Sequence, residues 1–178
     1  LNATILTIWM KSNMKNDLLS LIKSFGYAFK GIFWMVGHER NFRIHISCMA
    51  YMFYFLLRYD FFTVTRTQYA ILFLACASVL GGELINTGIE KSDDSITNEN
   101  RRTIGISKDT AAGAVLVFAI FAVLTGVAVL WQPEAFRLLF EHYKENPLYF
   151  ALFLLSIAAD TLFIFKFDLG KKEKTENE

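Results

Sequence analysis

The amino-acid sequence predicts an all-α protein, an integral-membrane bundle of helices. Hydrophobic residues make up 54% of its 178 residues, whereas about 45–50% is usual in soluble domains. Four apolar runs alternate with polar connections, and each crossing of a bilayer takes about 17–25 mostly apolar residues. An amphipathic stretch precedes these runs. Because the net charge is only +1, nothing indicates a general attraction to nucleic acid.

The first predicted element is an amphipathic helix at 17–38. Its apolar residues recur at spacings of three and four, while Lys23 and Lys30 occupy other faces. Beside a membrane domain, this pattern indicates a helix that lies in the lipid–water interface, with Asp17 as its N-cap. A core helix of a small soluble cap is the alternative. We expect residues 1–14 to lie upstream of the functional chain or to be disordered.

Four predicted spans follow the amphipathic helix. They cover about 42–59, 69–90, 109–131 and 148–167. The first is short and contains Arg43 and His45, so it crosses only if the bilayer ends near these residues and the basic group reaches water. The amphipathic helix and the first three spans form one membrane domain, which we place at 15–131.

The last part of the chain, 132–167, adds a short helix and the fourth span. The stretch at 133–147 is amphipathic and bounded by prolines, so we expect a short helix outside the cytoplasm. Asp160 lies near the middle of the fourth span, where it could pair across subunits, line a cavity or face a neighbouring helix. The polar tail at 168–178 is expected to be disordered and cytoplasmic.

The distribution of lysine and arginine predicts how the chain is oriented. Successive connections, starting with residues 1–43, carry 6, 2, 4, 2 and 4 basic residues. Basic residues concentrate on the cytoplasmic side of a membrane. Both termini and the 86–110 connection are therefore expected in the cytoplasm, the compartment that holds ATP.

Three polar residues, Glu83, Asn86 and Glu90, follow the apolar part of the second span. Their spacing puts them on one face of a helix, which carries a polar stripe from within the bilayer towards the cytoplasm. A charged group in hydrocarbon costs at least about 2.5–3.5 kcal/mol, so an intramembrane carboxylate indicates function. The alternative is that Glu83 and Asn86 only join helices through hydrogen bonds.

The polar stripe is part of a longer motif. It reads Glu83-x-x-Asn86-Thr87-x-Ile89-Glu90-x-x-x-Asp94, and Lys108–Asp109 and AAGAV follow it. This pattern resembles the signature of the small bacterial integral-membrane diacylglycerol kinases and undecaprenol kinases. Upstream, GYAFKGIFWMVGHERNFRIH is similar to the family's surface helix and first span, and HERNFRIH is closer to the undecaprenol kinase branch. The resemblance covers about Lys23 to Trp131.

The resemblance implies a kinase that uses ATP and Mg²⁺ to phosphorylate the terminal hydroxyl of a lipid in the bacterial cell membrane. Glu83 falls on the family's catalytic carboxylate and Asn86 on the amide beside it. Glu39 and Glu90 fall on its metal-binding carboxylates. The positions that contact the nucleotide or its metal are Tyr27, Glu39, Glu90, Glu99, Asn100, Arg101, Lys108 and Asp109. Family members are homotrimers of three-span protomers that share their sites between subunits.

These roles agree with the chemistry of phosphoryl transfer, which depends on positioning and charge neutralisation. Mg²⁺ is usually held by one or two carboxylates together with phosphate oxygens, and Lys108 can offset charge that develops on the phosphoryl group. Glu83 lies deeper than Glu90, so it is better placed to take the proton of a lipid hydroxyl. The chain departs from the family pattern at Gly88, where alanine is usual, at Ser20, where some members carry arginine, and in its fourth span.

Undecaprenol is the expected acceptor, and diacylglycerol is the second candidate. Two other classes of function stay open. An ATP-independent ion or proton carrier would use Glu83 and Asp160 as titratable groups in the membrane, but it gives no role to the cytoplasmic cluster. A kinase-like protein that has lost activity and only binds lipid would fit Gly88 and the fourth span, although every principal catalytic position is filled.

Overall fold

The computed structural model describes the backbone of residues 3–96 and 102–167 and the side chains of 17–95 and 102–167. Over these ranges the chain is helical and contains no strand, which confirms the predicted all-α class. The predicted disorder of 168–178 falls outside them. The helices are α1 (Ala3–His38), α2 (Arg40–Arg58), α3 (Arg66–Ile96), α4 (Arg102–Leu130), α5 (Pro133–Glu145) and α6 (Pro147–Lys166).

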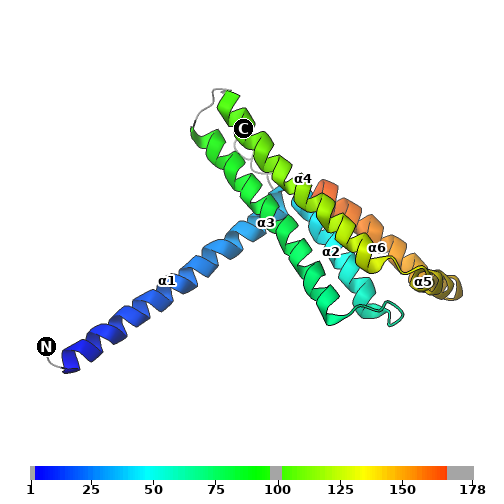
Figure 1. Ribbon diagram of the computed structural model, residues 1–178, viewed down its shortest axis with the longest axis horizontal. Helices are drawn as coiled ribbons and strands as arrows, with labels where there is room; N and C mark the ends of the chain where they lie inside the picture. Colours follow the sequence, from blue (N-terminus) through cyan, green and yellow to red (C-terminus); the bar gives the residue numbers. More distant parts are fainter. Residues whose placement is uncertain (1–2, 97–101, 168–178) are drawn as a thin grey trace.

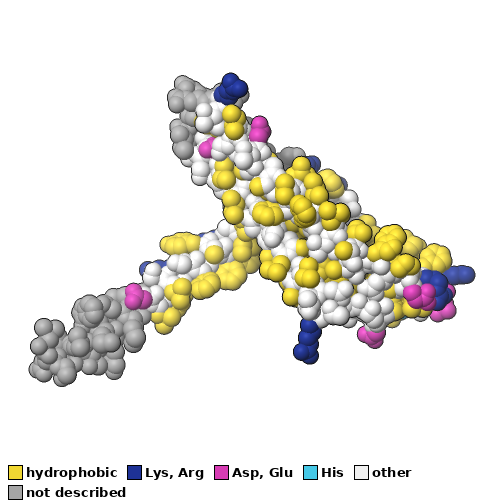
Figure 2. Space-filling model, viewed as in Figure 1, with side chains coloured by type: hydrophobic (Ala, Val, Ile, Leu, Met, Phe, Trp, Pro, Cys, Tyr) yellow, Lys and Arg dark blue, Asp and Glu magenta, His cyan; other side chains and the backbone are white. Residues whose placement is uncertain are grey.

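Helix α1 begins earlier than the sequence suggested and projects away from the other helices (Figure 1). Asp17 lies inside α1, so its predicted role as N-cap is wrong. Residues 3–16 contain neither glycine nor proline, and nothing in them stops the helix. The side chains from Asp17 to Trp34 are exposed, and Figure 2 shows hydrophobic side chains along this arm. An unpaired apolar face is what a helix at a membrane interface presents.

Three helices, α3, α4 and α6, are long and apolar enough to cross a membrane. Helices α3 and α4 pack along each other (Figure 1). A Cβ added at Gly82 would lie 2.9 Å from the Phe118 ring, so the absence of a side chain there sets how closely the two helices approach. Outward-facing residues such as Phe121 and Leu155 are 64% and 65% exposed, as expected of helices that face lipid.

Helix α2 packs against both α3 and α6, but it is not among the helices apolar enough to cross, so its crossing stays a prediction. The crossing was predicted only on the condition that the basic group reaches water, whereas Arg43 is buried, with 2% of its surface exposed. Its guanidinium donates to the carbonyls of Val36 and Ile164, at 3.1 Å each. These carbonyls lie in the last turns of α1 and α6, where helical partners are missing and the helix dipole is negative. Arg43 therefore joins the ends of three helices.

The far end of the bundle is closed by α5, the short helix predicted between the two prolines. Ala135 in its first turn packs on a core formed by α2, α3 and the connection between them: Leu56, Tyr59, Phe62 and Leu72. The Gln132 amide accepts from the Thr63 backbone N–H at 3.0 Å and donates to the Thr63 carbonyl at 3.0 Å. This reciprocal pair fixes the α2–α3 connection to the α4–α5 connection.

Candidate active site

The deepest member of the predicted stripe is a buried carboxylate in contact with a histidine. Glu83, in α3, is 5% exposed. Its Oε1 lies 3.3 Å from Nε2 of His45, a residue of the neighbouring helix α2. A buried carboxylate is strongly unfavourable unless a partner compensates it. His45 supplies that partner and fixes the direction in which the carboxylate faces.

The next members of the stripe are hydrogen-bonded to each other. Asn86 Nδ2 donates to Oε1 of Glu90 at 3.0 Å. Oδ1 of Asn86 is buried and has no hydrogen-bond partner among the described residues. A buried polar atom without a partner is unusual and calls for an explanation. The amide therefore orients Glu90 on one side and leaves a free oxygen on the other.

The oxygen atoms of Asn86 and Glu90 are of the type that binds a magnesium ion. Carboxylate and amide oxygens are hard ligands, and Mg²⁺ is commonly bound by one or two carboxylates plus substrate phosphates and water. The free Oδ1 of Asn86 beside Glu90 is such an oxygen. Over the part of the chain that the structure describes, no group of three or more His, Cys, Asp or Glu side chains is arranged to hold a metal ion. The protein alone would thus supply only part of a ligand shell.

A second group of charges lies where α3 and α4 extend beyond the level of α1 (Figure 1). The ammonium group of Lys108, at the start of α4, forms an ion pair with Asp94 at the end of α3. Asp93 and Glu90 are close enough for their charges to act on Lys108 as well. Lys91 lies over the ring of Trp34, 5.4 Å from its centroid. These contacts connect the part of α3 that follows the stripe to both α4 and α1.

The remaining predicted residues stand apart from these contacts. Glu39 occupies the break between α1 and α2 and caps no backbone N–H with its side chain. Tyr27 is 68% exposed on α1, and Asp109 is exposed on α4. Among the described residues, no hydrogen bond or ion pair joins these three to the stripe. The predicted nucleotide contacts at Glu99, Asn100 and Arg101 lie outside the described residues.

Two contacts of the site were not predicted. His45 was noticed only as a polar residue in a short span, and Trp34 only as part of the first helix. The signal for His45 was its place in HERNFRIH, six residues after Glu39 and on the face of α2 that meets α3. Pairing across helices depends on tertiary packing, which the periodicity of one helix does not reveal.

Comparisons with known proteins agree with this arrangement. The family model for prokaryotic diacylglycerol kinase matches residues 26–130. An undecaprenol kinase from Bacillus subtilis is 33% identical over 117 residues, which are 65% of this chain and 91% of that protein. A diacylglycerol kinase from a Synechocystis species is 35% identical over 115 residues, 64% of each chain. The diacylglycerol kinase of Escherichia coli K12 is 28% identical over 121 residues, 68% of this chain and 97% of that protein. No solved structure matches.

The chain therefore belongs to the prokaryotic diacylglycerol kinase family and is a lipid kinase. The matched residues begin within α1 and end at the last residue of α4. Glu83, Asn86, Glu90 and Lys108 lie within the match. Helices α5 and α6 lie outside it.

Proposed function

We propose that this protein transfers the terminal phosphate of ATP to the hydroxyl of undecaprenol in the bacterial cell membrane, with diacylglycerol as the alternative acceptor. The observation that carries the proposal is the pair of contacts on one face of α3. The buried Glu83 meets His45 at 3.3 Å, and Asn86 holds Glu90 at 3.0 Å. The similarity of HERNFRIH to the undecaprenol kinase branch, together with the Bacillus subtilis relative named undecaprenol kinase, supports undecaprenol.

Glu83 acts as the general base in this proposal. The proton of the lipid hydroxyl moves to the carboxylate, the hydroxyl oxygen bonds to the γ-phosphorus, and the bond from that phosphorus to the bridging oxygen breaks to release ADP. A base must lie within about 2.6–3.2 Å of the proton's oxygen, or one water away. His45 keeps the carboxylate oriented towards the lipid, so His45 is a positioning residue.

The part of the stripe formed by Asn86 and Glu90 receives the nucleotide. Glu90 and Glu39 would hold Mg²⁺, with Asn86 Oδ1 as a further oxygen, and the ion would neutralise charge on the phosphates. Lys108 offsets the charge that develops on the transferred group, which requires its ion pair with Asp94 to open when ATP binds. Further contacts to the nucleotide come from Tyr27, Glu99, Asn100, Arg101 and Asp109.

The isolated chain leaves some of these residues far from the stripe, which supports a homotrimer with shared sites. The α1 arm, on which Tyr27 is exposed, projects away from the bundle (Figure 1). Its apolar face from Leu18 to Phe33 has no partner among the described residues. Packing of this arm beside another protomer, at the membrane surface, would return Tyr27 to a site. The distribution of lysine and arginine supports an orientation in which both termini and the 86–110 connection lie in the cytoplasm.

The acceptor is tested with purified protein in lipid vesicles. Undecaprenol and diacylglycerol are supplied separately, with labelled ATP, and the phosphorylated lipid is quantified. We expect ATP-dependent phosphorylation of undecaprenol at the higher kcat/KM. A preference for diacylglycerol would move the assignment to the alternative, and lipid or ion movement without ATP consumption would contradict a kinase.

The metal assignment is tested with Glu90→Gln. Removing the charge is expected to weaken binding of magnesium–ATP by about 10- to 100-fold, the value of one hydrogen bond or ligand contact to a charged group. Glu145→Gln, an exposed change on α5, is the matched control. Equal magnesium–ATP affinity in both variants would show that Glu90 does not hold the metal.

A further inference from the structure

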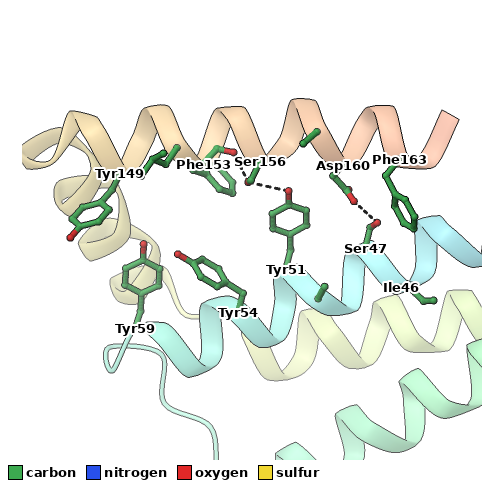
Figure 3. A pocket seen from close by; sticks show the side chains of 13 residues that line it. Ile46, Ser47, Tyr51, Tyr54, Tyr59, Tyr149, Phe153, Ser156, Asp160 and Phe163 are labelled. Carbon is green, nitrogen blue, oxygen red and sulfur yellow. Dashed lines mark hydrogen bonds between the residues drawn. The ribbon is translucent and has the colours of Figure 1, made fainter. Parts of the chain in front are cut away.

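A second candidate site lies on the other side of α2, between α2 and α6 (Figure 3). It is a cavity of about 800 Å³, lined by residues of α2 and α6 and by Tyr59, which follows α2. Pockets that bind small molecules are about 300–1,000 Å³, mostly apolar, and contain a few polar groups. Because α6 lies beyond residue 130, where the family match ends, this cavity is not part of the family's common core.

The cavity has a carboxylate near one end. Ser47 donates to Oδ1 of Asp160 at 2.6 Å, and one turn along both helices Tyr51 donates to the hydroxyl of Ser156 at 3.1 Å. The second oxygen of Asp160 accepts no hydrogen bond from any described residue. An intramembrane carboxylate is unfavourable and usually marks a functional position. Asp160 therefore offers a free acceptor at the end of the cavity.

The rest of the cavity is aromatic and elongated. Tyr54, Tyr59 and Tyr149 lie at the end opposite Asp160, and Phe153 lies between (Figure 3). Its wall follows α2 from Ile46 to Tyr59, which at about 1.5 Å per residue is about 20 Å. This is longer than one leaflet of a hydrocarbon core that is about 30 Å thick in total. The shape suits an extended hydrocarbon chain better than a compact polar ligand.

We infer that this cavity binds one long-chain lipid alcohol, with its hydrocarbon along the aromatic wall and its hydroxyl donating to Asp160. A carboxylate that served only to join two helices would be explained by its bond to Ser47, but it would not need a cavity beside it or a free oxygen. Ser47 and His45 are two residues apart on α2, so a hydroxyl at Asp160 lies at nearly the depth of Glu83. The inference does not rest on the proposed kinase activity, because it concerns binding without ATP.

The test uses the full chain in vesicles without nucleotide. The probe is octadecanol that carries a photoreactive diazirine in its chain, and the matched probe is the same chain without the hydroxyl. After illumination, labelled residues are mapped by mass spectrometry. We expect labelling of the α2 and α6 cavity wall, at least about tenfold stronger with the alcohol, as one hydrogen bond to a charged group provides. Equal labelling by both probes would overturn the inference.

Two neighbouring residues of α6 give a matched pair of variants. Both are exposed, but Ala159 lines the cavity and Ala158 does not. Ala159→Phe should fill the cavity and reduce labelling at least tenfold, and Ala158→Phe should leave it unchanged. Equal labelling of the two variants would contradict the proposal. If Ala159→Phe fails to fold, Ala50→Phe fills the same cavity from α2 and replaces it.

The last experiments test whether Asp160 binds the hydroxyl and which natural lipid carries that hydroxyl. Asp160→Leu should abolish the preference for the alcohol over the hydrocarbon probe. Excess unlabelled octadecanol must displace the probe, and its failure to do so would overturn the inference. Unlabelled undecaprenol and diacylglycerol are then added separately, and the one that displaces the probe at the lower concentration identifies the natural source of the alcohol. Since no ATP is present, a failure here is distinct from a failure of the kinase assignment.

Discussion

The two faces of α2 each meet a carboxylate inside the membrane region, and their surroundings differ. On the α3 side, Glu83 is 5% exposed and contacts His45, and the Asn86–Glu90 pair continues the polar path towards Lys108. On the α6 side, Asp160 contacts Ser47, and the path ends in an aromatic cavity. A carboxylate in hydrocarbon is unfavourable in both places. What distinguishes the two is the neighbouring chemistry: one leads to charges suited to phosphates, the other to a wall suited to a hydrocarbon chain.

A variant of Arg43 tests how strongly α2 is held to the ends of α1 and α6. Its guanidinium donates to α1 and α6 carbonyls and is buried, so Arg43→Leu removes hydrogen bonds to a charged group worth about 1.5–3 kcal/mol each. We expect the free energy of unfolding to fall by about 2–5 kcal/mol, measured by denaturation in micelles. Hydrogen exchange should rise more in α6 than in α3.

The control for this change is Arg40→Leu. Arg40 is exposed and lies over the Phe165 ring at 5.9 Å from its centroid, so its loss should cost less than about 1 kcal/mol. Similar destabilisation by the two variants would show that Arg43 does not hold the helix ends together.

Variants of His45 test only the contact between α2 and Glu83 of α3. His45→Ala leaves the buried Glu83 carboxylate without the partner that lies 3.3 Å away. It should lower lipid phosphorylation about 10- to 100-fold, which is about 1.4–2.7 kcal/mol of transition-state stabilisation. His45→Gln keeps an N–H donor and should recover part of this loss, which a merely space-filling role would not produce. Cys48→Ala, an exposed change on the same helix, should leave turnover unchanged. If Ala and Gln at position 45 behave alike, the positioning role is wrong.

Gly82 tests the spacing of α3 and α4 behind the stripe. Ala at this position would clash with Phe118, which must then rotate outward, and overpacking typically destabilises by about 1–3 kcal/mol. At Gly81 the same addition meets nothing within 4 Å. Gly81→Ala should therefore be neutral or stabilising by up to about 1 kcal/mol, and thermal unfolding of the pair separates the clash from the general effect of removing glycine.

The smallest expected effect is at Gly88, the position where the family usually carries alanine. An added Cβ there meets no atom within 4 Å, so Gly88→Ala should stabilise α3 by up to about 1 kcal/mol. A loss of stability in thermal unfolding would mean that Gly88 is packed against another protomer.

The sequence predicted the apolar helices well because hydrophobic length and period are local properties. The helices α3, α4 and α6 correspond to three of the four predicted spans, and α5 lies between the two prolines as expected. The prediction for Arg43 failed because tertiary contacts decide its burial: two helix ends supply its acceptors. The prediction for Asp17 failed for a local reason, since no residue upstream interrupts the helix.

The candidate site was predicted from the motif along α3 and α4, which is continuous in sequence. His45 was missed because it approaches Glu83 from another helix. The partner of Asp160 was left open for the same reason, since Ser47 is 113 residues away in sequence. The contacts of Tyr27 and Glu39 with the stripe, which the family resemblance implies, stay predictions that involve a second protomer.

The central claim is that Glu83 removes the proton of the lipid hydroxyl. It is tested most directly by a single turnover of Glu83→Gln with ATP already bound, in which formation of phosphorylated undecaprenol is followed in time. The account predicts that transfer slows by about 10²–10⁴-fold, the usual contribution of a general base, while the affinity for ATP is unchanged. If Glu83→Gln transfers phosphate at a rate within about threefold of the unaltered protein's, Glu83 is not the general base.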